Sequence, residues 1–270
     1  MSDYQANGGQ TYLPAAENIQ IPLKSCTELR EPSPKLAEPL LREEFAQNGY
    51  VAAEWSQHFL PGVTAEMLDW FWANLEKCYY LWAPGCHKSF TWIKSPAEYG
   101  FVQSVHKVCE SMGPGVPPMG GDGITLHRMD LTYFPFREHL EHVIIEAILN
   151  RKGEVFNLGV HMWQDVPGGC IHVTRGATNT RISEPPAFVI RFDEAEAQQG
   201  ELKQEQDVLP HPEYEAANWP LFLPKLYDVW KDHPDPSQNV FCDLKVCEEP
   251  DGTLRYCREN GPVILPKNPV

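Results

Sequence analysis

The stretch that decides the fold runs from Asp207 to Trp230 and reads DVLPHPEYEAANWPLFLPKLYDVW. Its apolar residues recur at helical spacing and predict one long helix late in the chain. Proline is tolerated in a first turn, whose amides have no partner within the helix, so Pro210 and Pro212 indicate where this helix begins. Either Asp207 caps the helix, in which case His211 is already helical, or His211 is itself the cap.

Shorter helical patterns and several strand-like runs precede this helix. Residues 40–49 and 65–82 have helical patterns, and Thr64 is a good cap for the second. Residues 136–150 (FREHLEHVIIEAILN) also have apolar positions at helical spacing, so we expect a helix there. Runs with strand character lie at 101–110, 123–134, 154–166, 170–176 and 186–192. After the long helix, residues 241–257 read as a hairpin around an Asp-Gly turn.

Antiparallel strands with a long late helix, and no alternation of strand and helix, predict an α+β fold. In such a fold the helix lies across a curved sheet, and the two enclose an apolar cavity. We expect an N-terminal arm and helices over residues 1–80, a catalytic domain over 81–232, and a hairpin tail over 233–270.

Composition and charge narrow the class of partner. The chain has 270 residues, 42% of them hydrophobic, and a formal net charge of −15. A phosphate backbone or an anionic membrane favours clustered Lys and Arg, which this chain does not show, so we expect neither nucleic acid nor membrane as a partner. The first residues lack a signal-peptide pattern, and no stretch of about 18 apolar residues occurs. We therefore expect a soluble cytoplasmic protein that acts on a small molecule.

The eight cysteines show no CxxC spacing, which argues against a zinc ribbon or a thioredoxin-type motif. In a reducing compartment most would be free thiols. Cys247 and Cys257 flank the predicted hairpin turn and could face each other, although free thiols are the simpler interpretation.

His211 and Glu215 lie four residues apart. In a helix they share one face and could hold one metal ion from adjacent turns. On its own this spacing is more typical of a surface ion pair.

Three separate segments resemble the phloretin hydrolase and 2,4-diacetylphloroglucinol hydrolase family. They are YYLWAPGCHKSFTWIKSP (79–96), GFVQSVHKVCESMGPG (100–115) and HPEYEAANWPLFLPKLY (211–227). The last is the most specific, because it joins the His-Glu spacing to Asn218 and FLPKLY. The resemblance runs from about Trp55 to Trp230 and implies a Bet v 1-like helix-grip fold with an N-terminal helical extension.

The resemblance also implies a zinc ion held by His87, Glu110, His211 and Glu215. This donor set suits zinc, which accepts imidazole nitrogen and carboxylate oxygen. The register of Glu110 is ambiguous because of the loop after it, and two other carboxylates are possible substitutes: Asp122 and Asp130.

Tyr79 and His161 resemble family residues that bind a phenolic oxygen and transfer a proton, and Glu110 would share in catalysis. Without the resemblance, Tyr79 reads as a core residue and His161 as a half-buried strand residue. Residues 171–180 (IHVTRGATNT) depart from the family pattern. We expect this segment to line the cavity, with His172 binding substrate.

A rival cluster lies in REHLEH, where Glu138 precedes His142 by four residues and His139 precedes it by three. It could form a second metal site. We prefer to interpret these residues as the solvated face of an amphipathic helix, because apolar residues occupy the opposite face.

Three functions follow. The resemblance implies a zinc-dependent hydrolase that cleaves the carbon–carbon bond between an aromatic polyphenol ring and its acyl group, with a small aromatic ketone as substrate. It also implies a homodimer. The changed segment 171–180 admits a metal-assisted cyclase or isomerase on the same fold. The third is a non-catalytic carrier of a hydrophobic ligand.

Overall fold

The structure is a computed structural model. It describes residues 10–12, 21–22, 40–111, 123–183, 211–231, 244–248, 250, 254–258 and 264–265. The strand expected at 186–192, the cap residue Asp207 and the candidate ligand Asp122 lie outside the described residues.

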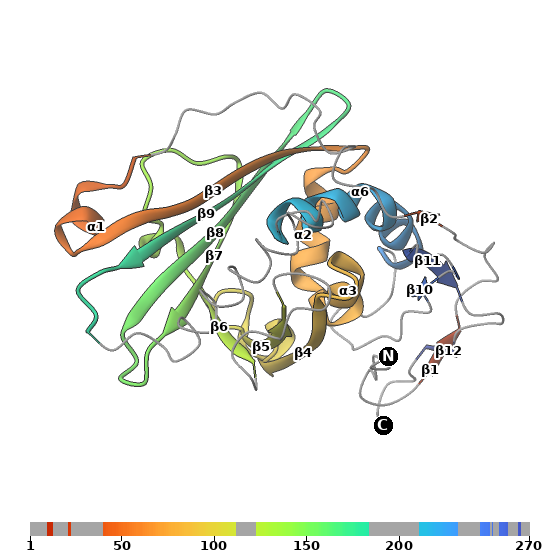
Figure 1. Cartoon of the computed structure of the whole chain (residues 1–270), viewed down its shortest axis with the longest axis horizontal. Helices are drawn as coiled ribbons and strands as arrows, with labels where there is room; N and C mark the ends of the chain where they lie inside the picture. The colour runs from red at the N-terminus through yellow and green to blue at the C-terminus, as the bar shows by residue number, and fades with distance from the viewer. Residues whose placement is uncertain are drawn as a thin grey trace.

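A seven-stranded antiparallel sheet forms the centre of the molecule (Figure 1). Its strand order is β3-β9-β8-β7-β6-β5-β4. The strands are β3 (Tyr50–Pro61), β4 (His87–Lys94), β5 (Val105–Glu110), β6 (Ile124–Met129), β7 (His142–Leu149), β8 (Val155–Val166) and β9 (Gly169–Asn179).

The helices lie mainly on one side of this sheet. Figure 1 shows α2, α3 and α6 grouped together against it, with α1 at the far end of β3. Their bounds are α1 (Glu43–Gln47), α2 (Ala65–Ala73), α3 (Leu75–Trp82), α4 (Pro96–Tyr99), the 3-10 turn η2 (Leu131–Tyr133) and α6 (His211–Trp230). The expected α+β helix-grip architecture, with a long late helix laid on an antiparallel sheet, is confirmed.

Both faces of the central strands are buried, which explains their apolar sequences. One face packs on α2, α3 and α6 through a cluster rich in aromatic rings, including Phe71, Trp72, Trp82 and Trp219. The other face packs on α1 and the segment after β6 through a second cluster: Phe45, Phe134, Phe136, Leu140, Ile145, Ala147, Leu158, Val160, Met162, Ile171, Val173 and Ala177. Residues of odd and even number therefore face different cores along each strand.

The helix expected at 136–150 is wrong. Residues 142–149 form the strand β7, paired with β6 and β8, and residues 137–141 have neither helical nor strand structure. A strand buried on both faces reads as a continuous apolar run, so its spacing resembled that of a helix. The β-branched residues Val143, Ile144 and Ile145 favour the strand.

The structure also differs from the expectations at its N-terminal part. The strand β3, which was not expected, lies within residues 1–80 and forms an edge of the main sheet along β9. The helical pattern at 65–82 divides at Asn74, which ends α2 and precedes α3. The Thr64 hydroxyl caps α2 by accepting a hydrogen bond from the Met67 amide at 3.3 Å.

Short strands near the chain ends form two small sheets. The hairpin of β10 (Leu244–Glu248) and β11 (Leu254–Arg258) is confirmed, and β11 also pairs with β2 (Ile21–Pro22). β1 (Gln10–Tyr12) pairs with β12 (Ile264–Leu265). The hairpin register places Cys247 opposite Arg255 and Cys257 opposite Lys245, so the two cysteines are not directly paired.

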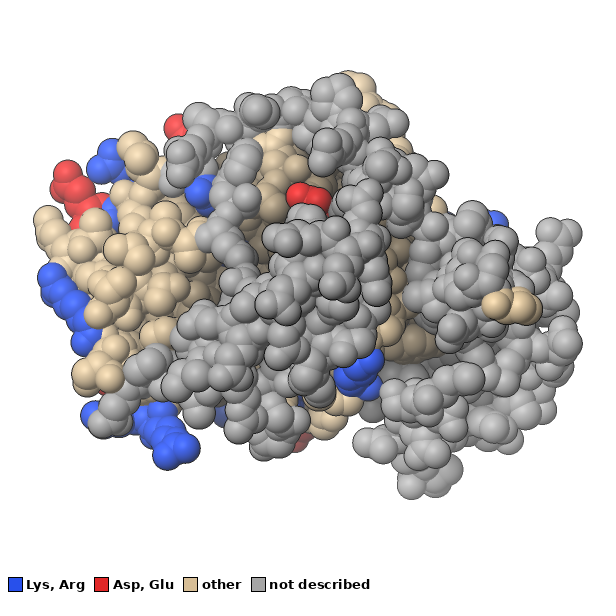
Figure 2. Space-filling model, viewed as in Figure 1, with Lys and Arg blue, Asp and Glu red and all other residues tan. Residues whose placement is uncertain are grey.

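Among the described helices, none combines the length and the apolar character that a membrane crossing requires. In the view of Figure 2, the charged side chains of the described residues are scattered, and the basic groups do not join into one continuous patch there.

Candidate functional site

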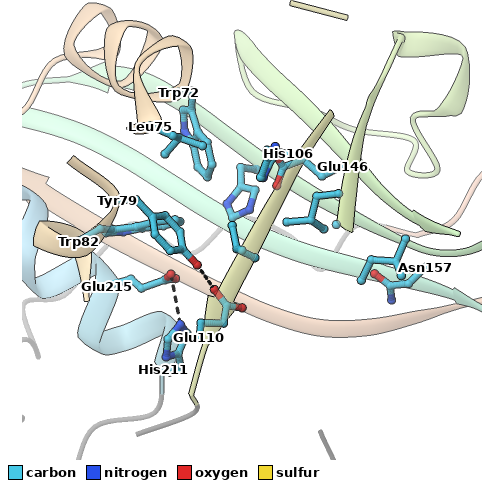
Figure 3. A pocket seen from close by; sticks show the side chains of 15 residues that line it. Trp72, Leu75, Tyr79, Trp82, His106, Glu110, Glu146, Asn157, His211 and Glu215 are labelled. Atoms are coloured by element: carbon cyan, nitrogen blue, oxygen red, sulfur yellow. Dashed lines mark hydrogen bonds and ion pairs between the residues drawn. The ribbon is translucent and has the colours of Figure 1, made fainter. Parts of the chain in front are cut away.

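A cavity of about 190 Å³ lies between the sheet and the helices. Its wall combines apolar and polar side chains from α2, α3, α6 and strands β5 to β8. They are Trp72, Leu75, Tyr79, Trp82, His106, Val108, Glu110, Leu126, Glu146, Ile148, Asn157, Gly159, His161, His211 and Glu215 (Figure 3). The cavity therefore brings together side chains that are far apart in the sequence.

One end of the cavity carries a cluster of metal-ligand type. His87 begins β4, whereas His211 and Glu215 lie on the first turns of α6. One ligand atom from each of these three residues lies within 4.8 Å of the other two. The Nε2 atoms of His87 and His211 are 3.3 Å apart, and Glu215 Oε1 lies 3.2 Å from His87 Nε2.

Glu110 lies beside this group at the end of β5. Its register is now fixed, because Glu110 pairs with His87 across β4 and β5. Glu110 Oε2 is 3.6 Å from His87 Nε2 and accepts a hydrogen bond from the Tyr79 hydroxyl. Three of the four expected ligands thus form a close group, and the fourth ligand, the Glu110 carboxylate, borders it.

The His87 ring is held in one orientation. Its Nδ1 lies 2.7 Å from the Tyr79 carbonyl oxygen, which requires the proton on Nδ1 and leaves the Nε2 lone pair directed at the cluster. The Tyr79 ring stacks on it with centroids 4.0 Å apart and only 3° between the planes. His87 is thereby prepared to act as a ligand through Nε2.

Electrostatics links the members of the cluster. Burial alone would lower the pKa of His211, but the Glu215 carboxylate raises it well above 6.5. The pKa of Glu215 is lowered below its usual value despite burial, because His211 and His87 stabilise its charged form. Burial and the Glu110 charge raise the pKa of Tyr79 well above 10, so its hydroxyl keeps its proton.

His161 also lines the cavity. It lies on β8, where its Nδ1 is 3.3 Å from the Thr174 hydroxyl and its ring packs on Trp72 with centroids 4.5 Å apart. Burial lowers the pKa of His161 to about 4, so the ring is neutral near pH 7.

His172 does not line the cavity. It lies behind His161 on β9, and the Trp219 ring of α6 packs against it at 4.6 Å. Both of its ring nitrogens are buried without a hydrogen-bond partner among the described residues, and burial lowers its pKa well below 6.5. No residue of the segment 171–180 lines the cavity either, so the departure from the family pattern lies outside its wall.

The remaining candidates do not gather at a site. Asp130 is exposed and caps η2 by accepting a hydrogen bond from the Thr132 amide at 2.8 Å. His142 pairs with Asp69 at 2.9 Å, whereas His139 contacts the Leu140 carbonyl. In the described part of the chain, the His87 cluster is the group found with metal-ligand geometry.

The sequence analysis missed a second polar group in the cavity wall. Glu146 of β7 accepts a hydrogen bond from Arg128 Nε at 3.2 Å, and His106 Nε2 lies 3.6 Å from the same carboxylate oxygen. All three residues are buried. A lone glutamate inside the apolar run HVIIEAIL (142–149) was an available signal, but it was assigned to a helix.

The residues present fit a divalent metal ion of the zinc type. Two imidazoles and one or two carboxylates form a donor set that zinc accepts. The carbonyl partner of His87 Nδ1 is the kind of outer contact that orients a ligating histidine. The His/His/Glu group can therefore hold a metal ion.

Comparison with known proteins identifies a family for this chain. A family model described as "DAPG hydrolase PhiG domain" matches residues 45–228 of the chain. This range contains His87, Glu110, His211 and Glu215. No curated protein matches the chain.

Several solved structures are similar at low identity. Human STARD10 is 14% identical with a TM-score of 0.36, covering 67% of this chain and 68% of its own. Norcoclaurine synthase from Thalictrum flavum is 13% identical with a TM-score of 0.33, covering 70% of this chain and 96% of its own. The major latex-like protein 151 of Panax ginseng is 9% identical with a TM-score of 0.34, covering 57% and 96% respectively.

Proposed function

This chain belongs to the DAPG hydrolase family, and from that premise we propose that it is a zinc-dependent hydrolase of acylated polyphenols. The bond cleaved is the carbon–carbon bond between the aromatic ring and the acyl group. Membership of a hydrolase family implies a small-molecule substrate, and the aromatic ketone is the finer part of the proposal.

The convergence of His87, His211 and Glu215 is the observation that carries this proposal. These residues come from β4 and α6, far apart in the chain, yet their ligand atoms lie within 4.8 Å of one another. Two of the three, together with Tyr79 and His161, also line the cavity. A carrier of apolar ligands has no need for buried imidazoles and carboxylates arranged in this way, because burying them costs free energy.

We propose His87, His211, Glu215 and Glu110 as the residues that hold the metal. When bound there, zinc would polarise a carbonyl oxygen and lower the pKa of a water molecule.

In the proposed reaction, one bond forms, one bond breaks and one proton is transferred. Water adds its oxygen to the acyl carbon, the bond from that carbon to the ring breaks, and the ring carbon takes up a proton. The products are a carboxylic acid and the deacylated ring. Neutral His161 would accept the proton that water releases and then donate it to the ring carbon.

Tyr79 is suited to hold the substrate in this reaction. Its hydroxyl keeps its proton and is directed at Glu110, at the border of the metal group (Figure 3). A phenolic or ketone oxygen beside Tyr79 would accept this hydrogen bond in place of the Glu110 carboxylate. Such positioning contributes to the rate because it orients the acyl group beside the reacting atoms.

The test uses an acetylated trihydroxybenzene as substrate in water enriched with heavy oxygen. Released acetic acid that carries one heavy oxygen, together with the deacylated ring, supports hydrolysis. A product with the same mass as the substrate would instead indicate an isomerase or cyclase. Tight binding of the substrate without formation of any product would indicate a carrier.

The matched variants are His211→Ala and His139→Ala. His211 belongs to the metal group, whereas His139 is exposed in the segment between η2 and β7. We expect the first to lose activity by at least 100-fold, in line with the loss of a metal ligand, and the second to keep it. Equal activity in both variants would contradict the proposal.

A further inference from the structure

The cavity has a second polar end, formed by Glu146 and His106. Figure 3 shows these two side chains across the cavity from His211 and Glu215. Among the described residues, the contacts of the Glu146 carboxylate with Arg128 and His106 both involve Oε1, so Oε2 can accept a further hydrogen bond at the cavity wall. His106 is 1% exposed, and its Nδ1 has no hydrogen-bond partner among the described residues.

A buried carboxylate and a buried imidazole in this position require an explanation. Neighbouring positions of the same sheet face are apolar, such as Leu126 and Ile148. Burying polar groups without full hydrogen bonding costs free energy, because the contacts that they made with water are not replaced. A ligand that completes these hydrogen bonds would recover that cost.

The charges of this end select a neutral ligand. Arg128 lies beside Glu146 and balances its charge through the 3.2 Å contact of Nε. Burial lowers the pKa of His106 well below 6.5, so its ring is neutral. A carboxylate accepts hydrogen bonds, and a neutral imidazole offers one donor or acceptor nitrogen. A hydroxyl group suits both, because it donates to the carboxylate and can also bond to the ring nitrogen.

Space for a ring lies next to this polar end. Gly159 of β8 is paired directly with Glu146 of β7, and it lines the cavity. A Cβ atom added at Gly159 would have only the Glu146 carbonyl oxygen near it, at 3.7 Å. Glycine within a strand often marks a place where a ligand approaches closely. The missing side chain therefore leaves room in the cavity wall next to Glu146.

The cavity size agrees with one aromatic ring. An apolar cavity of about 150 Å³ in another protein holds benzene. The described residues here enclose about 190 Å³, which is enough for one ring with small substituents. A ring whose acyl group lies at the metal group would present its opposite edge to Glu146.

We propose that Glu146 and His106 form a subsite that recognises the phenolic hydroxyl opposite the acyl group of the substrate. The assignment of that substrate rests on the proposed function. Glu146 is then a specificity-determining residue and Gly159 provides the space for the ring edge. The hydrogen bond would also make the hydroxyl more electron-releasing toward the opposite ring carbon. That carbon bears the acyl group and must take up the proton.

The test compares two ligands that differ by this hydroxyl alone. One is acetophenone with hydroxyls at both ortho positions and at the para position, and the other lacks the para hydroxyl. Binding is measured by quenching of tryptophan fluorescence, since Trp72 and Trp82 line the cavity. The wild-type protein should bind the first at least tenfold more tightly, the effect of one hydrogen bond to a charged acceptor.

Two variants locate the effect. Arg128→Met/Glu146→Leu removes both charges together, because Glu146→Leu alone would leave a buried arginine unpaired. The preference should fall to within twofold while zinc content is unchanged. Gly159→Ala adds a methyl group to the cavity wall next to Glu146, with no contact closer than 3.7 Å. It should reduce the preference at least threefold with an unchanged melting temperature. Arg42→Met/Glu44→Leu is the matched control, because it removes a 3.1 Å ion pair with a more exposed location.

The outcomes separate this inference from the proposed function. A twofold or smaller preference in the wild type, or a full preference in a folded Arg128→Met/Glu146→Leu variant, would overturn the subsite. Should that variant not fold, an unchanged preference in Gly159→Ala would overturn it. A preference that disappears as expected, in a protein that releases no acid, would support the subsite and contradict hydrolysis instead.

Discussion

His161 should make the folded chain sensitive to acid. Its ring is buried in the cavity wall, and burial lowers its pKa from 6.5 to about 4. In the unfolded chain the ring takes up a proton as the pH falls through 6.5, whereas the folded chain does so only near pH 4. The unfolded state therefore binds more protons in this window, and the free energy of unfolding decreases as the pH falls from 6.5 to 4.

The magnitude follows from the shift. At about 1.4 kcal/mol per pKa unit, lowering the pH from 7 to 4.5 should cost roughly 2–3 kcal/mol through His161 alone. The variant His161→Asn should lack this part of the loss. Urea unfolding of both proteins at pH 7 and 4.5 gives the comparison, and metal release at low pH cancels because both retain the same metal group.

The control is His139→Asn, whose ring is exposed in the folded chain. Its loss of stability between the two pH values should match that of the wild type. If His161→Asn also loses as much free energy of unfolding as the wild type, His161 is not buried in neutral form and its proposed role as proton acceptor fails.

Three further changes test the packing and the site. Trp219→Ala should lower the free energy of unfolding, measured by urea denaturation, by about 3–5 kcal/mol, because Trp219 is fully buried and its ring stacks on that of Trp82 with centroids 5.0 Å apart. A loss below about 1 kcal/mol would contradict this packing. Tyr256→Phe removes the 2.6 Å hydrogen bond from β11 to the Leu81 carbonyl and should cost about 1 kcal/mol in the same assay, with no loss contradicting that contact. Tyr79→Phe should reduce kcat/KM for the acetylated trihydroxybenzene by about tenfold or more with zinc retained, and unchanged kinetics would exclude its hydroxyl from substrate binding.

The long helix and the ligands on it could be predicted because their signals are local. The His-Glu spacing, the prolines of the first turn and the apolar pattern all lie between residues 207 and 230, and α6 begins at His211. The hairpin at β10 and β11 likewise depends on its own turn residues. Such features need no knowledge of distant contacts.

The strand β7 and the polar end of the cavity could not be obtained in the same way. Residues 142–149 are buried by clusters on both faces, so their apolar pattern does not show which period applies. With β7 taken as a helix, Glu146 could not be placed beside Arg128 and His106, which come from neighbouring strands. Position across a sheet is set by register, and register depends on strands that are distant in sequence.

The claim that His87, His211 and Glu215 share one ion is tested most directly by metal content. Purified protein should contain close to one zinc per chain, and His211→Ala should contain much less while remaining folded by circular dichroism. Exposed His139→Ala should retain the wild-type amount. Zinc that is absent from the active wild type, or present equally in folded His211→Ala, would contradict the account.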